Sequence, residues 1–144
     1  MTKLLTALFL CLTFVSCGQT KQNFDKDKNR IDNVCDNFMK QFVASNTVEA
    51  LDLLKQNTVM QPSSIDTLKV TIAEQIKNVF PQFGTMISSE FIKERKVKDF
   101  IAKRFYIIKF TNFFLKVDFT LYRSANGWTI TSFHYNEEAE ELLE

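Results

Sequence analysis

The spacing of apolar residues changes near Gly84, and this change constrains the fold more than any other feature of the chain. Before Gly84, apolar residues recur every three or four positions, as on the buried face of a helix. After it they alternate with polar residues, as in a strand that buries one face. The sequence therefore predicts an α+β domain in which N-terminal helices cover one face of a sheet.

Three amphipathic helices are expected in the first part of the chain. The apolar stripe of the first comprises Ile31, Val34, Cys35, Phe38 and Phe42. The second begins after Asn46, because Asn46 and Glu49 have the spacing of a capping box. Its inward residues are Val48, Leu51 and Leu54. The two helices would share one core.

The third helix follows the loop around Pro62. Ser63 or Ser64 can cap its first turn, and Pro81 stops it because proline cannot continue a helix. Its apolar stripe comprises Ile65, Leu68, Ile72, Ile76 and Val79.

Four antiparallel strands are expected in the second part of the chain. Their ranges are 86–94, 103–110, 113–123 and a last strand that starts at Trp128. The connection between the first two is interpreted as a hairpin, although the spacing over 95–102 also fits an amphipathic helix. Strands that follow one another through short loops pair as an antiparallel meander.

The last two strands meet at Asn126-Gly127, a pair typical of a tight hairpin turn. A loop of two or four residues turns Trp128 inward, whereas a loop of three turns it outward. Burying the indole stabilises by several kcal/mol at about 25 cal/mol per Å², so the inward register is favoured. This register puts four residues on the face of Phe119 and Leu121, namely Trp128, Ile130, Ser132 and His134.

The order of these elements resembles the cystatin-like, nuclear-transport-factor-two-like superfamily, in particular its small bacterial lipoproteins of unknown function. The resemblance rests on Gly84 before the first strand, on Asn126-Gly127, and on the Trp-Thr-Ile and Phe that follow; it covers about 29–136. It implies a cone in which a curved four-stranded sheet and the helices enclose a pocket. Some members use that pocket for small ligands and some for catalysis.

The N-terminus carries an apolar run of twelve residues, Leu4 to Val15, after a single positive charge at Lys3. A spanning helix needs about 20 apolar residues, so this run suits an export signal that is removed. Ser16 and Cys17 resemble the cleavage site of bacterial lipoproteins, with Phe14 where that motif usually has leucine. We therefore expect residues 1–16 to be a signal peptide and Cys17 to be acylated.

Residues 17–29 are polar and aperiodic, which is typical of a flexible tether, and 30–144 is long enough for one domain. Removing Lys3 leaves 17 basic and 17 acidic side chains, so the sequence offers no support for a nucleic-acid partner. The three glycines form no phosphate loop, and one histidine with one free cysteine cannot complete a zinc site of these ligand types unless a second chain contributes. No cofactor or metal is expected. The free thiol of Cys35 is expected to be a small buried hydrophobe.

His134 is the main candidate for chemistry, as a general base in a pocket with Trp128, Phe119 and Ser132. The predicted register turns Asp118 to the opposite face, so His134 lacks a carboxylate to orient it. A noncatalytic binding role is therefore expected. The alternative is a small isomerase or dehydratase-like enzyme that uses the pocket beside His134.

The outer face of the last hairpin is expected to gather four aromatic side chains, Phe114, Tyr122, Phe133 and Tyr135. Monomers seldom expose such a patch, so it is interpreted as a surface for a homodimer or a protein partner. The alternative is that the acidic C-terminal segment covers it. A separate basic cluster, Lys93 to Arg104, is read as a solvated sheet edge.

These inferences together predict a lipid-anchored protein of the cell envelope that faces the periplasm. Such an anchor fits either the inner or the outer membrane.

Overall fold

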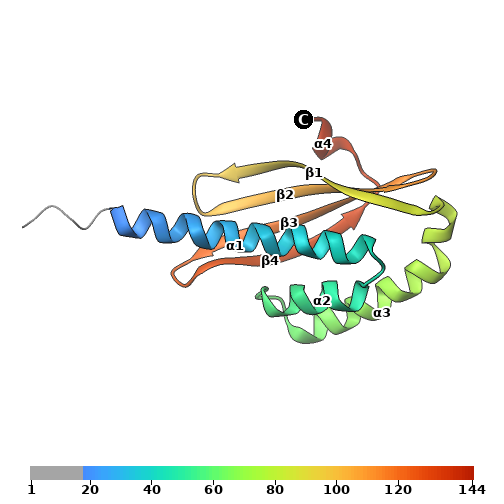
Figure 1. Cartoon of the computed structure of the whole chain (residues 1–144), viewed down its shortest axis with the longest axis horizontal. Coiled ribbons are helices and arrows are strands. Elements are labelled where there is room, and N and C mark those ends of the chain that lie inside the picture. Colours follow the sequence, from blue (N-terminus) through green and yellow to red (C-terminus); the bar gives the residue numbers. More distant parts are fainter. Residues whose placement is uncertain (1–17) are drawn as a thin grey trace, which may run out of the picture.

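The computed structural model describes residues 18–144, with side chains from Lys26 onward, and Cys17 lies outside the described residues. The elements in order are α1 (Gly18–Val43), α2 (Thr47–Gln56), α3 (Pro62–Asn78), η1 (Phe80–Phe83), β1 (Met86–Val97), β2 (Ile101–Phe110), β3 (Phe114–Ser124), β4 (Gly127–Asn136) and α4 (Glu140–Leu143). The four strands form one antiparallel sheet in the order β1-β2-β3-β4. The predicted α+β fold class is confirmed, and Figure 1 shows α1 lying along the sheet with α2 and α3 below it.

The core lies between α1 and the inner face of the sheet. The predicted stripe of α1 is buried, including the thiol of Cys35, and Phe38 is at its centre. The ring of Phe38 packs at 5.3 Å from Phe119 and 5.0 Å from Phe133, centroid to centroid. Aromatic pairs at such spacings add to the free energy gained from burial alone.

Helix α2 begins where predicted, but the capping box does not form. The side chain of Asn46 makes no cap hydrogen bond; its Nδ2 donates instead to the side-chain oxygen Oε1 of Gln41. Val48 is 58 % exposed, so its predicted inward position is wrong, and Ala50 takes that place beside Leu51 and Leu54.

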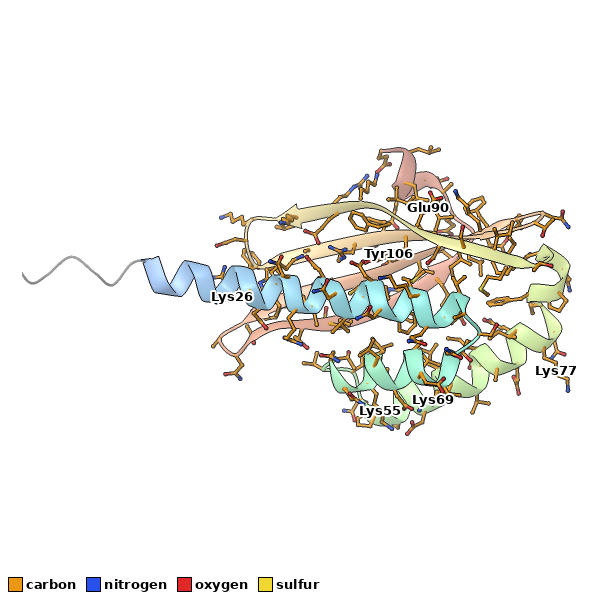
Figure 2. All side chains as sticks on the ribbon, in the orientation of Figure 1. Lys26, Lys55, Lys69, Lys77, Glu90 and Tyr106 are labelled. Carbon is orange, nitrogen blue, oxygen red and sulfur yellow. The ribbon has the colours of Figure 1, made fainter. Side chains whose placement is uncertain are left out.

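Helix α3 begins at Pro62 rather than after a serine cap, with Gln61 as the residue before it. Proline suits this position because the first helical amides have no acceptor within the helix. Side chains tie α3 to α2, since Lys55 donates to Asp66 and Lys69 to Asp52. Figure 2 shows both lysines where the two helices run side by side.

Helix α1 differs from the flexible tether expected for residues 17–29, because it runs without a break from Gly18. Its first described side chains contact the sheet. The Asp27 carboxylate accepts from the backbone N–H of Trp128, and Arg30 donates to the carbonyl of Trp128 at 3.0 Å. These residues fix the helix to the β3–β4 hairpin and therefore belong to the domain.

The hairpin interpretation of residues 95–102 agrees with the structure. Strand β1 continues to Val97, a turn follows, and β2 begins at Ile101. Lys98 in this turn has a φ of 52°, and the Arg123 amide donates to the Phe100 carbonyl at 2.8 Å, which attaches the turn to β3.

The β3–β4 turn is a two-residue loop, Ala125-Asn126, and two residues is one of the two loop lengths that the sequence leaves open. Ser124 pairs with Gly127, and Trp128 and Ile130 are buried as predicted. Gly127 has a φ of 112°, and a side chain there would collide with the Asp27 carboxylate. Glycine is therefore required both for the turn and for the close approach of α1.

A β-bulge breaks the predicted register beyond Ile130. Leu121 pairs with Ile130 but Thr120 pairs with Ser132, so Thr131 is an additional residue in β4. Every residue after the bulge therefore lies on the opposite face of the sheet from the one that uninterrupted alternation would give it. Phe133 consequently enters the core, where burial of its ring stabilises by about 2 kcal/mol, whereas uninterrupted alternation would have exposed it.

Candidate functional site

The bulge turns His134 to the outer face of the sheet and brings it next to Asp118. The two residues are direct cross-strand partners, and His134 Nδ1 lies 3.7 Å from Asp118 Oδ1. The histidine side chain is 66 % exposed and the carboxylate only 3 %. The prediction that Asp118 faces away from His134 is therefore wrong, because that prediction assumed uninterrupted alternation.

The four predicted pocket residues do not surround one pocket. Phe119 and Trp128 lie in the core on the inner face. Ser132 pairs with Thr120, and His134 with Asp118, on the outer face. The bulge between Ile130 and Ser132 is the reason for the separation.

The predicted aromatic patch is wrong for two of its four members. Phe114 and Tyr122 lie on the outer face, and Tyr122 is exposed. Phe133 is buried, and Tyr135 packs against the core while its hydroxyl donates to Gln75 of α3 at 2.6 Å. The proposed interaction face is thus reduced to a pair of aromatic residues at opposite ends of β3.

A charged site occupies the outer face instead, beneath the C-terminal residues 137–144, which we call the tail. Its two central cations are Lys103 of β2 and Lys116 of β3, and both donate to the Glu141 carboxylate, at 2.9 and 2.5 Å. Lys116 is only 1 % exposed. Hydrogen bonds from Lys116 and Lys103 lower the pKa of Glu141 to about 2, so this carboxylate is ionised at neutral pH.

Strand β1 holds the backbone of the tail. Lys93 donates to the carbonyl of Leu142 at 3.0 Å, and Arg95 donates to the carbonyl of Glu141 at 3.1 Å. Phe105 forms the buried floor, and three cations lie within 5.8 Å of its ring centroid, namely Lys93, Arg95 and Lys103. We call Lys93, Arg95, Lys103, Phe105 and Lys116 the outer basic site.

Asp118 is at the edge of the outer basic site. Its Oδ1 lies 3.5 Å from the ammonium of Lys103, and it is buried without a hydrogen bond. Burial acts to lower the pKa of Lys103, but the hydrogen bond to Glu141 and the charge of Asp118 outweigh it and raise that pKa. A buried acceptor without a donor is costly, so Asp118 favours any group that can donate to it.

A second charged cluster lies on the inner face, between α1 and strands β1 and β2. It comprises Lys28, Asp32, Asp36, Glu94, Arg104 and Tyr106, which we call the inner network. Arg104 reaches three carboxylates within 3.2 Å and donates to the Tyr106 hydroxyl at 3.0 Å. Figure 2 shows Tyr106 between α1 and the strands.

The inner network is satisfied by groups of the chain itself. Tyr106 donates to Asp36 at 2.5 Å, and burial, with this hydrogen bond, raises the pKa of Tyr106. The guanidinium of Arg104 also lies over the ring of Phe91, at 4.4 Å from its centroid. These contacts attach α1 to β1 and β2 and give the cluster a structural role.

A small hollow lies between α1, η1 and the inner face of the sheet. Its volume is about 10 Å³, far below the about 300–1,000 Å³ that small-molecule pockets usually have. Its lining is aromatic and aliphatic, formed by Phe38, Phe42, Phe80, Ile108, Leu115, Val117, Phe133 and Tyr135. None of the predicted pocket residues lines it.

Sequence reasoning missed the outer basic site, although the sequence contains both a basic cluster and an acidic C-terminal segment. The basic cluster around β1 and β2 and the acidic tail have opposite charges, and their complementarity was the available signal. Lys116 gave no separate signal, since a lysine on the polar face of a strand is ordinarily solvated.

No family model matches the chain, and comparisons with curated proteins and with solved structures give no match. Within residues 18–144, no helix is long and apolar enough to cross a membrane.

Proposed function

We propose that this chain is a lipid-anchored protein of the bacterial cell envelope, facing the periplasm, with a noncatalytic domain that binds a ligand or a protein. The observation that carries the proposal is the short apolar N-terminal run that ends in Ser16-Cys17. Several acyl chains at Cys17 would hold the protein where a single chain binds only reversibly. The cystatin-like resemblance remains part of this proposal.

The start of α1 supports an anchor close to the domain. The helix begins at Gly18, one residue beyond the proposed acylation site, and continues to Val43 without a break. A lipid on Cys17 would therefore be joined to the domain by helix, at about 1.5 Å per residue.

Substitution of the acylated residue tests the anchor. We expect the wild-type protein to sediment with membranes and its intact mass to show loss of residues 1–16 plus lipid. Cys17→Ser should release the protein from the membrane or stall its processing, whereas Cys35→Ser serves as a control that keeps the anchor. An unmodified N-terminus elsewhere in the chain would contradict the proposal.

The outer face of the sheet supports a binding role. The outer basic site already holds an acidic segment through side-chain and main-chain contacts. Such contacts are those by which proteins recognise acidic peptides.

A second candidate function is a small isomerase or dehydratase-like enzyme, which the pair of His134 and Asp118 favours. A carboxylate beside an imidazole can orient it as a general base. Against this reading, the pair lies on an open strand surface with His134 two-thirds exposed.

A screen of turnover separates the two functions. We expect His134→Ala to leave the fold and the binding properties intact, because the exposed imidazole carries little packing. Asp118→Asn is the matched test of the orienting group. Loss of a measurable wild-type turnover in both variants would establish the enzymatic function instead.

A further inference from the structure

We infer that the outer basic site is a recognition site for an acidic segment of a partner protein, and that the tail occupies it in the absence of that partner. The inference deepens the binding role proposed above and rests on it, but it does not depend on acylation of Cys17. Failure of the test below would therefore leave the anchor proposal standing.

The first argument is the burial of a cation beneath a thin cover. Lys116 is among the most deeply buried side chains of the described residues, yet the segment above it is a single four-residue helix. No residue of α4 is buried, and Leu143 is 86 % exposed. Charge complementarity, rather than apolar packing, holds the tail in place.

The second argument is that the site recognises general peptide features. It binds the Glu141 carboxylate through Lys103 and Lys116, and two consecutive main-chain carbonyls through Arg95 and Lys93; Arg95 also forms a longer ion pair with Glu144, at 3.7 Å. Any segment with an acidic residue in an equivalent backbone position presents the same three groups. The site is therefore specific for acidic peptide and indifferent to most of the tail's own sequence.

The third argument is that the tail gives no hydrogen bond to one buried acceptor of the site, which has only an ion pair with Lys103 at 3.5 Å. Oδ1 of Asp118 is buried without a hydrogen bond, and His134 beside it is exposed. A partner whose acidic residue lies near a hydroxyl or amide donor would satisfy this acceptor as well. A second copy of this chain would bring only the same tail, so a different protein is the occupant that the site favours.

Release of the tail requires only local opening. Terminal segments with few buried apolar contacts open at low cost compared with global unfolding. Figure 1 shows α4 at the C-terminus beside β1, apart from α2 and α3, so its departure leaves the core covered. The partner then competes with the tail, which has a high effective concentration at the site because it belongs to the same chain. Weakening the contacts between the tail and the site should therefore strengthen partner binding.

The test measures binding of a fluorescent peptide with the sequence of residues 137–144, as a probe for the acidic partner, to the full chain. We expect Glu141→Gln to bind the peptide about two- to fivefold more tightly than the wild type, because its own tail competes less. Glu138→Gln removes the same charge from a tail residue whose hydrogen bonds, among residues 18–144, are with Asn136, and it should bind like the wild type.

The site is then removed in the Glu141→Gln background. Lys116→Met should weaken peptide binding at least tenfold, and Lys103→Met, at a more exposed position, tests the same site if the first variant does not fold. A peptide with glutamine in place of its Glu141 should bind about two- to fivefold more weakly than the acidic peptide.

Three results would overturn the inference. They are no peptide binding by Glu141→Gln at millimolar concentration, equal binding by the lysine variants, and equal binding of the neutral peptide. A wild-type dimer in which two copies exchange tails would assign the site to a second copy and overturn the assignment to a partner protein.

Discussion

The two faces of the sheet bury basic side chains in different ways. On the inner face, Arg104 is enclosed by α1, β1 and β2, and its carboxylate partners belong to those elements. On the outer face, Lys116 is covered by the tail, and its partner Glu141 comes from that segment. A charge enclosed by core elements can be released only by unfolding, whereas one covered by a terminus can be released while the fold persists.

The largest expected difference between the faces concerns their aromatic residues. Phe133→Ala should lower the free energy of unfolding by about 3 to 4 kcal/mol, because a cavity would remain beside Phe38 and Phe119. Tyr122→Ala, on the outer face, should cost about 0.5 kcal/mol or less. Urea denaturation of both variants provides the measurement. Equal effects would mean that the bulge and the inward position of Phe133 are wrong.

Removal of the central cation of the inner network should have the next largest effect. Arg104→Met leaves Asp32, Asp36 and Glu94 close together without their common partner, and breaking a buried pair in this way costs about 3 kcal/mol. Lys109→Met is the control, since Lys109 and Glu90 form an exposed pair worth under about 1 kcal/mol. Thermal unfolding of the two variants would compare them. If Arg104→Met lowered the free energy of unfolding by no more than Lys109→Met does, the inner network would contribute no more to stability than an exposed ion pair.

The smallest expected effect is the pH dependence of the tail. The pKa of Glu141 is lowered to about 2 by Lys116 and Lys103, from about 4.3 in an unfolded chain. A lowered pKa means that the stabilisation is complete above about pH 4.5 and is lost as the pH falls towards 2. Because the Glu141 side chain is 41 % exposed, the contribution should remain under about 1 kcal/mol.

Unfolding of the wild type and of Glu141→Gln between pH 2 and 6 measures this contribution. The difference between the two should be greatest near pH 6 and vanish near pH 2, while the protection of the tail amides against hydrogen exchange, relative to an unfolded chain at the same pH, should fall as the pH is lowered. Glu138→Gln should follow the wild type throughout. A difference that is constant with pH would show that the carboxylate charge does not hold the tail.

The fold class was predictable from the sequence because local periodicity determines it. Helical spacing up to Ile76 and alternation from Phe114 to Leu121 report the period of the backbone directly. The register at the start of β4 was predictable because the burial of Trp128 left one favourable face for it, although the loop residues are Ala125-Asn126 rather than Asn126-Gly127.

The bulge was missed because a single period was assumed for the whole of β4. The sequence does contain the signal: apolar residues occupy even positions at Trp128 and Ile130 and odd positions at Phe133 and Tyr135. Such a switch of parity within one strand indicates an additional residue. The position of His134, and with it the candidate catalytic pair, depended on this one residue.

The outer basic site was not predictable from local patterns. The burial of Lys116 depends on a tail residue 25 positions later in the chain. Alternation identifies which face a strand residue occupies, but it does not reveal what will cover that face.

Helix α1 continues without a break from Gly18, which limits how far the domain can move relative to Cys17. If Cys17 carries the lipid, a helix without slack limits both the reach and the tilt of the domain, so the protein searches by lateral diffusion along the membrane. In Figure 1 the β1–β2 and β3–β4 turns lie towards the same end as the start of α1, whereas α4 lies away from it. An acidic partner would then be encountered at a fixed height above the lipid, and membrane-bound partners of matching height would be selected over those that diffuse freely.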